Sequence, residues 1–206
     1  MNKETIAIID YKIGNIISIK NGFNLINIDT YVSDNPDEIE KFNKIVLIGV
    51  GSFPSAMSNL NSFGFTKLIK NHIKKGGYLL GICVGMQLLM SQGYEFKATK
   101  GLDLITGTVD KMDKNRKIKL PHVGWNNFEK KININLFNSI DIESNYYFVH
   151  SYSINVNDRQ AKTMNFNYSG ENYIGAIQKN KIYGFQFHPE KSQEPGLKLL
   201  KNFYNL

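Results

Sequence analysis

A lone cysteine flanked by glycines is the residue best suited to chemistry in this chain. Cys83 is the only cysteine, and it stands in the stretch GICVGMQ at residues 81–87. The apolar run at 78–80 predicts a strand before it, and the pattern at 84–90 predicts a helix after it. A nucleophile on a sharp strand-to-helix turn needs small residues two positions away on either side, and both are glycine. The pattern predicts a nucleophile, because a buried structural cysteine does not require these glycines.

A histidine and a glutamate near the C-terminus are the candidates to activate this cysteine. They lie in the segment YGFQFHPE at residues 183–190. Side chains alternate along a strand, so Gln186, His188 and Glu190 are expected on one face. Glu190 can then hold one imidazole nitrogen of His188 while the other nitrogen faces Cys83, as in a catalytic triad. The alternative is a turn with a half-buried histidine and a solvated glutamate.

The first half of the chain alternates apolar strand patterns with helical ones. This order predicts a parallel sheet flanked by helices. The carboxyl ends of parallel strands meet at one edge of such a sheet, where sites form. The expected strands are 5–9, 28–32, 44–48 and 78–82, and the expected helices are 15–25, 35–38, a region from 55 to 75 broken near Gly64, and 84–90.

From residue 102 the pattern changes to short alternating strands separated by turn residues. These predict antiparallel hairpins at 104–109, 117–120, 146–150, 161–167, 173–178 and 182–187, followed by an amphipathic helix at 194–204. We expect one α/β domain over residues 1–206, with a three-layer, flavodoxin-like fold: a central, mostly parallel sheet, helices on both faces and an added antiparallel region.

The composition of the chain limits the partners and the cellular location that can be expected. The chain has 206 residues and a formal charge of +7, with no apolar run long enough to span a membrane. One cysteine forbids an internal disulfide, and no signal peptide precedes the first strand, so a cytoplasmic protein is expected. Basic residues cluster only at 111–119, where a solvated hairpin is favoured over a site for an acidic partner or a phosphorylated substrate. We expect no nucleic-acid partner.

Five segments together resemble one known family. They are GVG at 49–51, GICVGMQ at 81–87, PHVGWN at 121–126, YFVHSY at 147–152 and HPEKS at 188–192. The chain is similar over nearly its whole length to the class I glutamine amidotransferases, and most closely to the glutaminase subunits of imidazole glycerol phosphate synthase. The cysteine elbow and His-Pro-Glu are common to the class, whereas Trp-Asn and Val-His-Ser-Tyr narrow the resemblance to these subunits.

The resemblance implies hydrolysis of glutamine to glutamate and ammonia, without a metal or cofactor. Cys83 would attack the side-chain amide, His188 would move the proton, and Glu190 would orient the imidazole. The oxyanion would be held by backbone N–H groups of Val84 and of the glycine loop, at Val50 and Gly51. The residues implied to contact the substrate are Gly49, Gln87, Glu95 for the α-ammonium, and Ser151 and Tyr152 for the α-carboxylate.

The resemblance also implies a protein partner. Free ammonia would be protonated in water, and the family solution is a heterodimer with a (β/α)8 barrel synthase that receives ammonia through its interior. That subunit would convert a phosphoribosyl-formimino intermediate to imidazole glycerol phosphate and an aminoimidazole carboxamide ribotide (AICAR), in histidine biosynthesis. The implied interface residues are Asn15, Trp125, Asn126 and Lys191.

Two positions depart from the family pattern. Ile48 stands where a proline usually precedes Gly-Val-Gly, and Lys12 stands where glycine is usual after Asp-Tyr. We expect Ile48 to alter the oxyanion loop, because proline would fix φ and remove an N–H. The departures keep two alternatives open: the same glutaminase chemistry serving a synthase of amidino-sugars or surface glycans, and a catalytically silent scaffold subunit. Binding of nucleic acid rests on charge alone.

Overall fold

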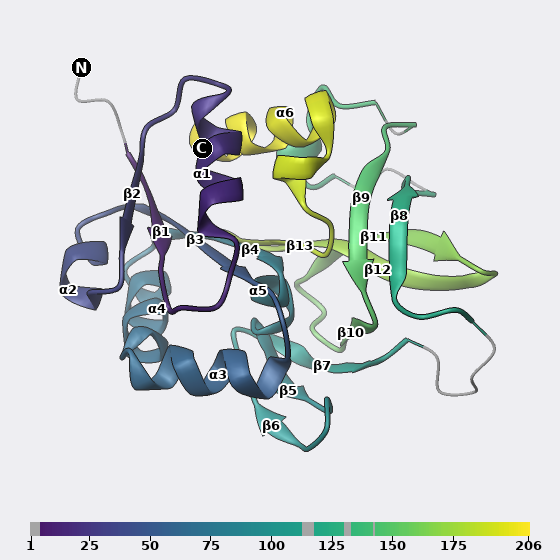
Figure 1. Ribbon diagram of the computed structural model, residues 1–206, viewed down its shortest axis with the longest axis horizontal. Coiled ribbons are helices and arrows are strands. Elements are labelled where there is room, and N and C mark those ends of the chain that lie inside the picture. Colours follow the sequence, from purple (N-terminus) through teal and green to yellow (C-terminus); the bar gives the residue numbers. More distant parts are fainter. Residues whose placement is uncertain (1–4, 113–117, 130–132, 142) are drawn as a thin grey trace.

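The computed structural model describes residues 5–112, 118–129, 133–141 and 143–206 (Figure 1). Its largest sheet has seven strands in the order β11-β12-β13-β4-β3-β1-β2. The five strands from β13 to β2 are parallel, and β12 and β11 continue the sheet antiparallel. In chain order these strands are β1 (Ile6–Ile9), β2 (Thr30–Ser33), β3 (Lys44–Gly49), β4 (Tyr78–Cys83), β11 (Lys162–Tyr168), β12 (Glu171–Lys179) and β13 (Ile182–Phe185).

Helices cover both faces of this sheet, as predicted. In Figure 1, α1 and α6 lie on one face and α3 and α4 on the other. Every residue of β1 and β3 is buried, as expected for strands covered on both sides. The helices are α1 (Ile16–Asn24), α2 (Pro36–Ile39), α3 (Phe53–Ser62), α4 (Phe65–Lys74), α5 (Val84–Gln87) and α6 (Gln193–Tyr204).

Local chemistry explains where the helices begin. The Asn15 side chain accepts a hydrogen bond from the Ser18 N–H and caps α1, and the Ser52 side chain caps α3 in the same way. The predicted break near Gly64 is confirmed, because this residue has a φ of 78° and separates α3 from α4. Such a left-handed turn favours glycine.

Two smaller sheets form the added region, in which every strand pair is antiparallel except β5 with β7. One has the order β10-β7-β5-β6, and the other is the antiparallel pair β8-β9. Their strands are β5 (Met90–Gly93), β6 (Thr99–Lys100), β7 (Ile105–Lys111), β8 (His122–Asn126), β9 (Tyr146–His150) and β10 (Tyr152–Val156); single 3-10 turns, η1 (Asn135–Phe137) and η2 (Pro189–Lys191), complete the elements. The α/β architecture with an antiparallel addition is therefore confirmed.

Several predicted boundaries were wrong. Residues 118–120 form no strand, because β9 ends at His150 opposite His122 and leaves them nothing to pair with. The helix expected over 84–90 ends at Gln87, since Met90 joins β5 beside Ile105. Strands β5, β6, β8 and β10 were not predicted. Most of the basic cluster, residues 113–117, lies outside the described residues.

Lys12 occupies a position with a glycine-like backbone. Its φ is 64°, the left-handed region that explains why glycine is usual there. Its ammonium group lies 2.9 Å from a carboxylate oxygen of Asp10 and 2.8 Å from one of Asp34. The two ion pairs fix this side chain on the surface, so the substitution keeps the turn that the loop requires.

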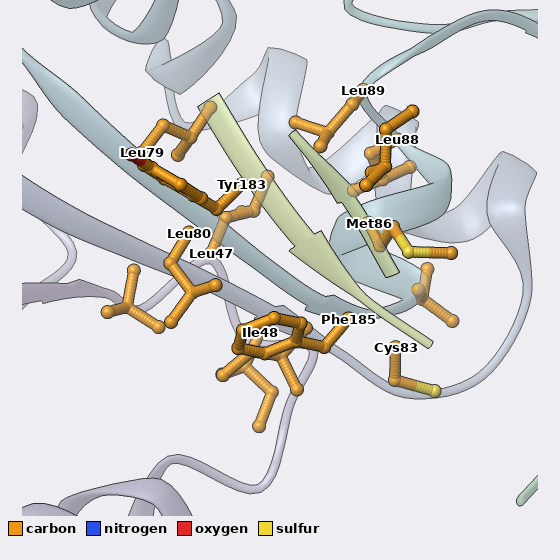
Figure 2. Close-up of a cluster of buried hydrophobic side chains, with 14 of the residues drawn as sticks. Leu47, Ile48, Leu79, Leu80, Cys83, Met86, Leu88, Leu89, Tyr183 and Phe185 are labelled. Carbon is orange, nitrogen blue, oxygen red and sulfur yellow. The ribbon is translucent and has the colours of Figure 1, made fainter. Parts of the chain in front are cut away.

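The apolar core is built around β3, β4 and β13. Figure 2 shows Leu47, Leu80 and Phe185 among the buried side chains of this cluster, with Cys83 at one end of it. Among the described residues, no helix is long and apolar enough to cross a membrane.

Gly85 allows α5 to pack directly on the backbone of β3. A Cβ atom at this position would collide with the carbonyl group of Leu47. We predict that Gly85→Ala lowers the free energy of unfolding by about 3 kcal/mol, in the range of overpacked cores. Urea denaturation would measure it, with Ser58→Ala on the exposed side of α3 as the control, expected within about 0.5 kcal/mol of wild type. Equal stability of the two variants would contradict the close packing.

Candidate active site

Cys83 sits on a strained turn between β4 and α5. Its φ of 54° and ψ of −116° are rarely adopted by a residue with a side chain. Gly81 and Gly85 permit this turn, because a Cβ on Gly81 would lie 2.6 Å from the Gly85 carbonyl oxygen. Backbone strain of this kind is typical of functional sites and amounts to about 1–3 kcal/mol. The structure therefore has the strand-turn-helix geometry that the flanking glycines predict.

The thiol opens into a cavity of about 340 Å³. The lining residues come from the ends of β3, β4, β9 and β10, from α5 and from the loops after β5 and β13. They include most of the residues to which the resemblance assigns a catalytic or binding role, together with Val149 and His150 of the YFVHSY segment. The lining consists of Val50, Gly51, Cys83, Val84, Gln87, Glu95, Val149, His150, Ser151, Tyr152 and His188.

His188 and Glu190 are held by a turn and not by the strand that the sequence predicts. β13 ends at Phe185, because its parallel partner β4 turns away after Ile82. The His188 N–H then donates to the Tyr147 carbonyl at 2.9 Å, and Glu190 lies in η2. The imidazole Nδ1 is 2.9 Å from the Glu190 Oε1, with both side chains almost completely buried. The turn thus achieves the pairing expected from strand alternation.

The electrostatics of His188 favour its charged form. Burial opposes the charge, but the Cys83 sulfur and the Glu190 carboxylate outweigh it and raise the pKa of His188 to about 10. Its Nε2 makes no hydrogen bond to another described residue, which leaves this nitrogen available beside the thiol. The arrangement can therefore hold a proton between the sulfur and the carboxylate.

The glycine loop lies directly beside Cys83. β3 pairs with β4 in a register that sets Gly49 opposite Cys83, so both strands end together. Val50 and Gly51 line the cavity, and Gly51 has a φ of 87°. Gly49 does not line it: a Cβ there would meet the hydroxyl of Tyr11 and the side chain of Val84. Backbone groups of this loop and of Val84 thus surround the sulfur.

The opposite wall of the cavity carries polar side chains. The Glu95 carboxylate accepts a hydrogen bond of 2.7 Å from the Phe53 N–H at the start of α3. Burial raises the pKa of Glu95. Gln87 is buried, and its Nε2 donates to the Tyr152 carbonyl at 3.1 Å and to Gln186 Oε1 at 3.0 Å. Ser151 contributes to the lining beside Tyr152.

Three polar groups close to the site have no role assigned to them from the sequence. Gln186 is completely buried and its Nε2 lies 3.8 Å from the Cys83 sulfur. Tyr11 is completely buried beside Gly49. His150 donates through Nδ1 to the Tyr152 carbonyl at 2.8 Å, and its Nε2 lies 3.3 Å from Nδ1 of His122. Only Gln186 gave a signal, because strand alternation placed it on the face of His188.

The four expected interface residues lie in different environments. Trp125 is 48% exposed and packs edge-on against Tyr147, over whose ring the Lys191 ammonium lies at 5.8 Å. Asn126 donates to the Asn167 carbonyl at 2.7 Å, and Asn15 caps α1. Trp125 and Lys191 are therefore free to contact a partner, whereas both asparagine side chains also serve the fold.

The described part of the chain offers no group of three or more metal-binding side chains. The strand-to-helix elbow at Cys83 and the buried His188–Glu190 pair form the arrangement that is typical of hydrolases with a cysteine nucleophile.

Comparisons with known proteins narrow this class. Residues 7–206 match the family of class-I glutamine amidotransferases. The subunit HisH 1 of imidazole glycerol phosphate synthase from Campylobacter jejuni strain RM1221 is 42% identical over 98% of this chain and its own full length. The HisH subunit from Chlorobium chlorochromatii is 40% identical over the same shares of the two chains. The chain therefore belongs to the class-I glutamine amidotransferases, in the family of HisH subunits.

Solved structures support the fold. The structure of PurLQS from Thermotoga maritima superposes with a TM-score of 0.73 at 15% identity, covering 98% of each chain. A glutamine amidotransferase from the same organism gives 0.61 at 20% identity, covering 96% of this chain and 89% of its own. At these identities the likeness concerns the fold alone.

Because His122 and His150 are buried, we predict that the free energy of unfolding decreases at acidic pH. Burial lowers the pKa of His122 to about 4 and that of His150 to about 3. The unfolded chain binds protons below pH 6.5 and the folded chain does not, so stability falls as the pH drops from 6.5 towards 4. The slope is about 1.4 kcal/mol per pH unit for each histidine.

His122→Phe should keep the ring stacking on Phe148 and Phe166. It should reduce the slope of stability against pH by about 1.4 kcal/mol per pH unit, the contribution of one histidine. Urea unfolding of both proteins between pH 7 and pH 5 measures the difference. Parallel stability curves would show that His122 is charged in the folded protein.

Proposed function

We propose that residues 1–206 act as a single glutaminase domain that hydrolyses glutamine to glutamate and ammonia. The domain passes the ammonia to a synthase subunit with a (β/α)8 barrel. The observation that carries the proposal is the convergence of Cys83, the His188–Glu190 pair and the glycine loop on one cavity. Its volume of about 340 Å³ lies at the lower end of small-ligand pockets and suits an amino acid.

The first half of the reaction forms a thioester. The Cys83 sulfur attacks the side-chain carbonyl carbon of glutamine, and a C–S bond forms. His188, which keeps its proton at neutral pH, gives it to the amide nitrogen. The C–N bond then breaks and ammonia leaves.

Water completes the reaction. It attacks the thioester carbon while His188 takes one of its protons, and the C–S bond breaks to release glutamate. Glu190 keeps the imidazole in place throughout. In both steps negative charge develops on the carbonyl oxygen, and we assign its stabilisation to the N–H groups of Val84, Val50 and Gly51, which line the same cavity as Cys83.

The polar wall of the cavity fits the other end of glutamine. Glu95 faces the α-ammonium group, because its carboxylate is the acidic side chain in the lining. Ser151 and Tyr152 hold the α-carboxylate, and Gln87 and Gly49 shape the site behind the nucleophile. Because one cavity would hold both ends of the substrate, only a short amino-acid amide would fit.

The partner would dock on the exposed face of β8 and β9. Val123, Trp125 and Val149 are 55%, 48% and 37% exposed, which is unusual for apolar side chains on neighbouring strands. Val149 also lines the cavity, so this face reaches the mouth of the site. A subunit covering it would receive ammonia before it meets bulk water. Lys191, Asn15 and Asn126 complete the proposed interface.

The relatives' names suggest the acceptor. They are subunits of imidazole glycerol phosphate synthase, and the corresponding partner would release that product and AICAR. The Campylobacter jejuni and Methanococcus maripaludis relatives are numbered HisH 1 and HisH 2. The departures at Ile48 and Lys12 leave a second candidate, a related synthase that uses ammonia to amidinate a sugar or a surface glycan.

Cys83→Ala should abolish glutamate release, by at least about 10⁴-fold, because no other thiol is present. Glutamate is measured with and without the barrel subunit and its ribotide substrate. Lys74→Ala, on the distant helix α4, serves as the control. Wild-type protein that is inactive with its partner would instead support the silent scaffold.

Mixing wild-type chain with each candidate synthase distinguishes the two acceptors. We expect glutamate release to rise with the barrel subunit and its phosphoribosyl-formimino substrate, and imidazole glycerol phosphate to form in equal amount. Stimulation only by a sugar-amidinating synthase would favour the second candidate.

Ile48 is buried in β3, immediately before the glycine loop. Ile48→Pro should restrict that loop and lower the basal rate by about two- to fivefold, the scale of proline effects on backbone freedom. The partner-stimulated rate should change less. Ile48→Val is the control for lost packing, and a ratio of stimulated to basal rate equal to wild type would contradict the idea.

A further inference from the structure

Gln186 is a buried amide in contact with the nucleophile, and the proposed mechanism does not use it. Its side chain is completely excluded from solvent, and its Nε2 lies 3.8 Å from the Cys83 sulfur. Its backbone is held where β13 ends, because the Gln186 N–H donates to the Gly175 carbonyl at 2.9 Å. The contact with sulfur is therefore made by a fixed group in a dry environment.

Two neighbouring residues, Tyr152 and Gln87, determine which end of the Gln186 amide faces the sulfur. The Tyr152 carbonyl oxygen can only accept, so the Gln87 side chain must turn its Nε2 towards it. The same nitrogen also donates to Gln186, which must therefore present its oxygen, Oε1. The Nε2 of Gln186 is then the group that remains for the sulfur. One backbone carbonyl thus determines, through two amides, that Cys83 faces an N–H donor.

His150 keeps that carbonyl in place. Its Nδ1 hydrogen-bonds the Tyr152 oxygen at 2.8 Å, and its Nε2 pairs with His122 at 3.3 Å. Because the carbonyl accepts, His150 carries its proton on Nδ1 and accepts from His122 through Nε2. The Tyr152 carbonyl therefore accepts from His150 on one side and from Gln87 on the other, and Gln87 in turn donates to Gln186, whose amide reaches the sulfur.

We propose that Gln186 is a further catalytic residue, whose side-chain N–H stabilises the Cys83 thiolate opposite His188 and whose orientation is fixed by Gln87 and the Tyr152 carbonyl. A hydrogen bond to an anion is stronger than one to a neutral thiol, so the donor favours the charged nucleophile. It also limits the directions that the sulfur can take. The proposal deepens the proposed function and rests on Cys83 as its nucleophile.

The groups that face the sulfur are known, so a change in its titration can be assigned. His188 stands on one side, and the buried Tyr11 stands behind, with its pKa raised by burial and by Cys83. Glu95 and His150 line the same cavity. Replacing Gln186 alters none of these side chains directly.

Alkylation by iodoacetamide tests the proposal without glutamine or the partner. Cys83 is the only thiol, so the rate of alkylation reports on this sulfur alone. Gln186→Leu removes the donor, and we expect the midpoint of the pH–rate profile to rise by about one unit, which lowers the rate at pH values below the midpoint about tenfold. Gln178→Leu is the matched control, since Gln178 is a buried glutamine on β12 outside the cavity lining.

Two further variants make the result decisive. Gln186→Glu keeps an acceptor for Gln87 but puts a carboxylate oxygen at the sulfur, and it should also raise the midpoint. Gln87→Met frees the amide of Gln186 to reverse, so it should raise the midpoint by less, although Gln87 does not touch the sulfur in the hydrogen-bond network. In glutaminase assays Gln186→Glu should lower kcat about tenfold and leave KM nearly unchanged.

A wild-type midpoint in folded Gln186→Leu would overturn the proposal. If that variant does not fold, a wild-type midpoint in Gln186→Glu would overturn the proposal instead. A wild-type midpoint in Gln87→Met would refute the claim that Gln87 fixes the orientation of the Gln186 amide. Thermal unfolding of each variant separates folding from titration. Failure of the glutaminase function would appear as inactive wild-type protein with alkylation profiles still shifted as expected.

Discussion

The site depends on β3 and β4 ending side by side. Their parallel register continues to the last pair, Gly49 and Cys83, so the glycine loop and the nucleophile leave the sheet at the same level. The glycine at 85 then lets the next helix start against the Leu47 carbonyl. Without this close backbone contact the elbow would move away from the loop, and Cys83 would no longer share one cavity with Val50 and Gly51.

A third strand brings the charged half of the site. β13 lies on the other side of β4 and ends at Phe185, so His188 reaches the sulfur from the neighbouring edge of the sheet. The segment after β13 is fixed from two directions, by the Tyr147 carbonyl and by the Ser192 hydroxyl, which donates to the His188 carbonyl at 2.6 Å. The imidazole is therefore positioned by backbone contacts, and its rotation is limited by Glu190.

Sequence patterns predicted the parts of the structure that depend on local chemistry. Glycines at fixed distances from Cys83, the alternation of strands and helices, and the break at Gly64 each have a local cause, and each prediction agrees with the structure. The convergence of the motifs also depends on β13, which the sequence predicts in an antiparallel hairpin and which pairs with β4 in parallel as well as with β12 in antiparallel orientation.

The parts that could not be predicted depend on distant contacts. β5, β6 and β10 are short: β5 and β10 pair with β7, and β6 pairs with β5. His72 and His122 are both buried, although histidine is a polar residue and nothing in the local sequence marks either position as part of the core. His72 is buried because its ring packs beneath Gly77 and its Nε2 meets the Tyr78 carbonyl at 3.0 Å. Neither neighbour is visible in a helical pattern alone.

Several groups in the site lower the free energy of unfolding. Among the described residues, the Tyr11 hydroxyl, His188 Nε2 and Glu190 Oε2 are buried without a hydrogen-bond partner. Each such group disfavours the folded state by about 1–3 kcal/mol, and the backbone of Cys83 adds strain of similar size. These destabilising groups lie at the strand ends. The buried leucines and isoleucines, whose packing stabilises the fold and offsets them, lie within the sheet. A substrate or partner that satisfied these atoms would therefore bind most favourably where the fold is least relaxed.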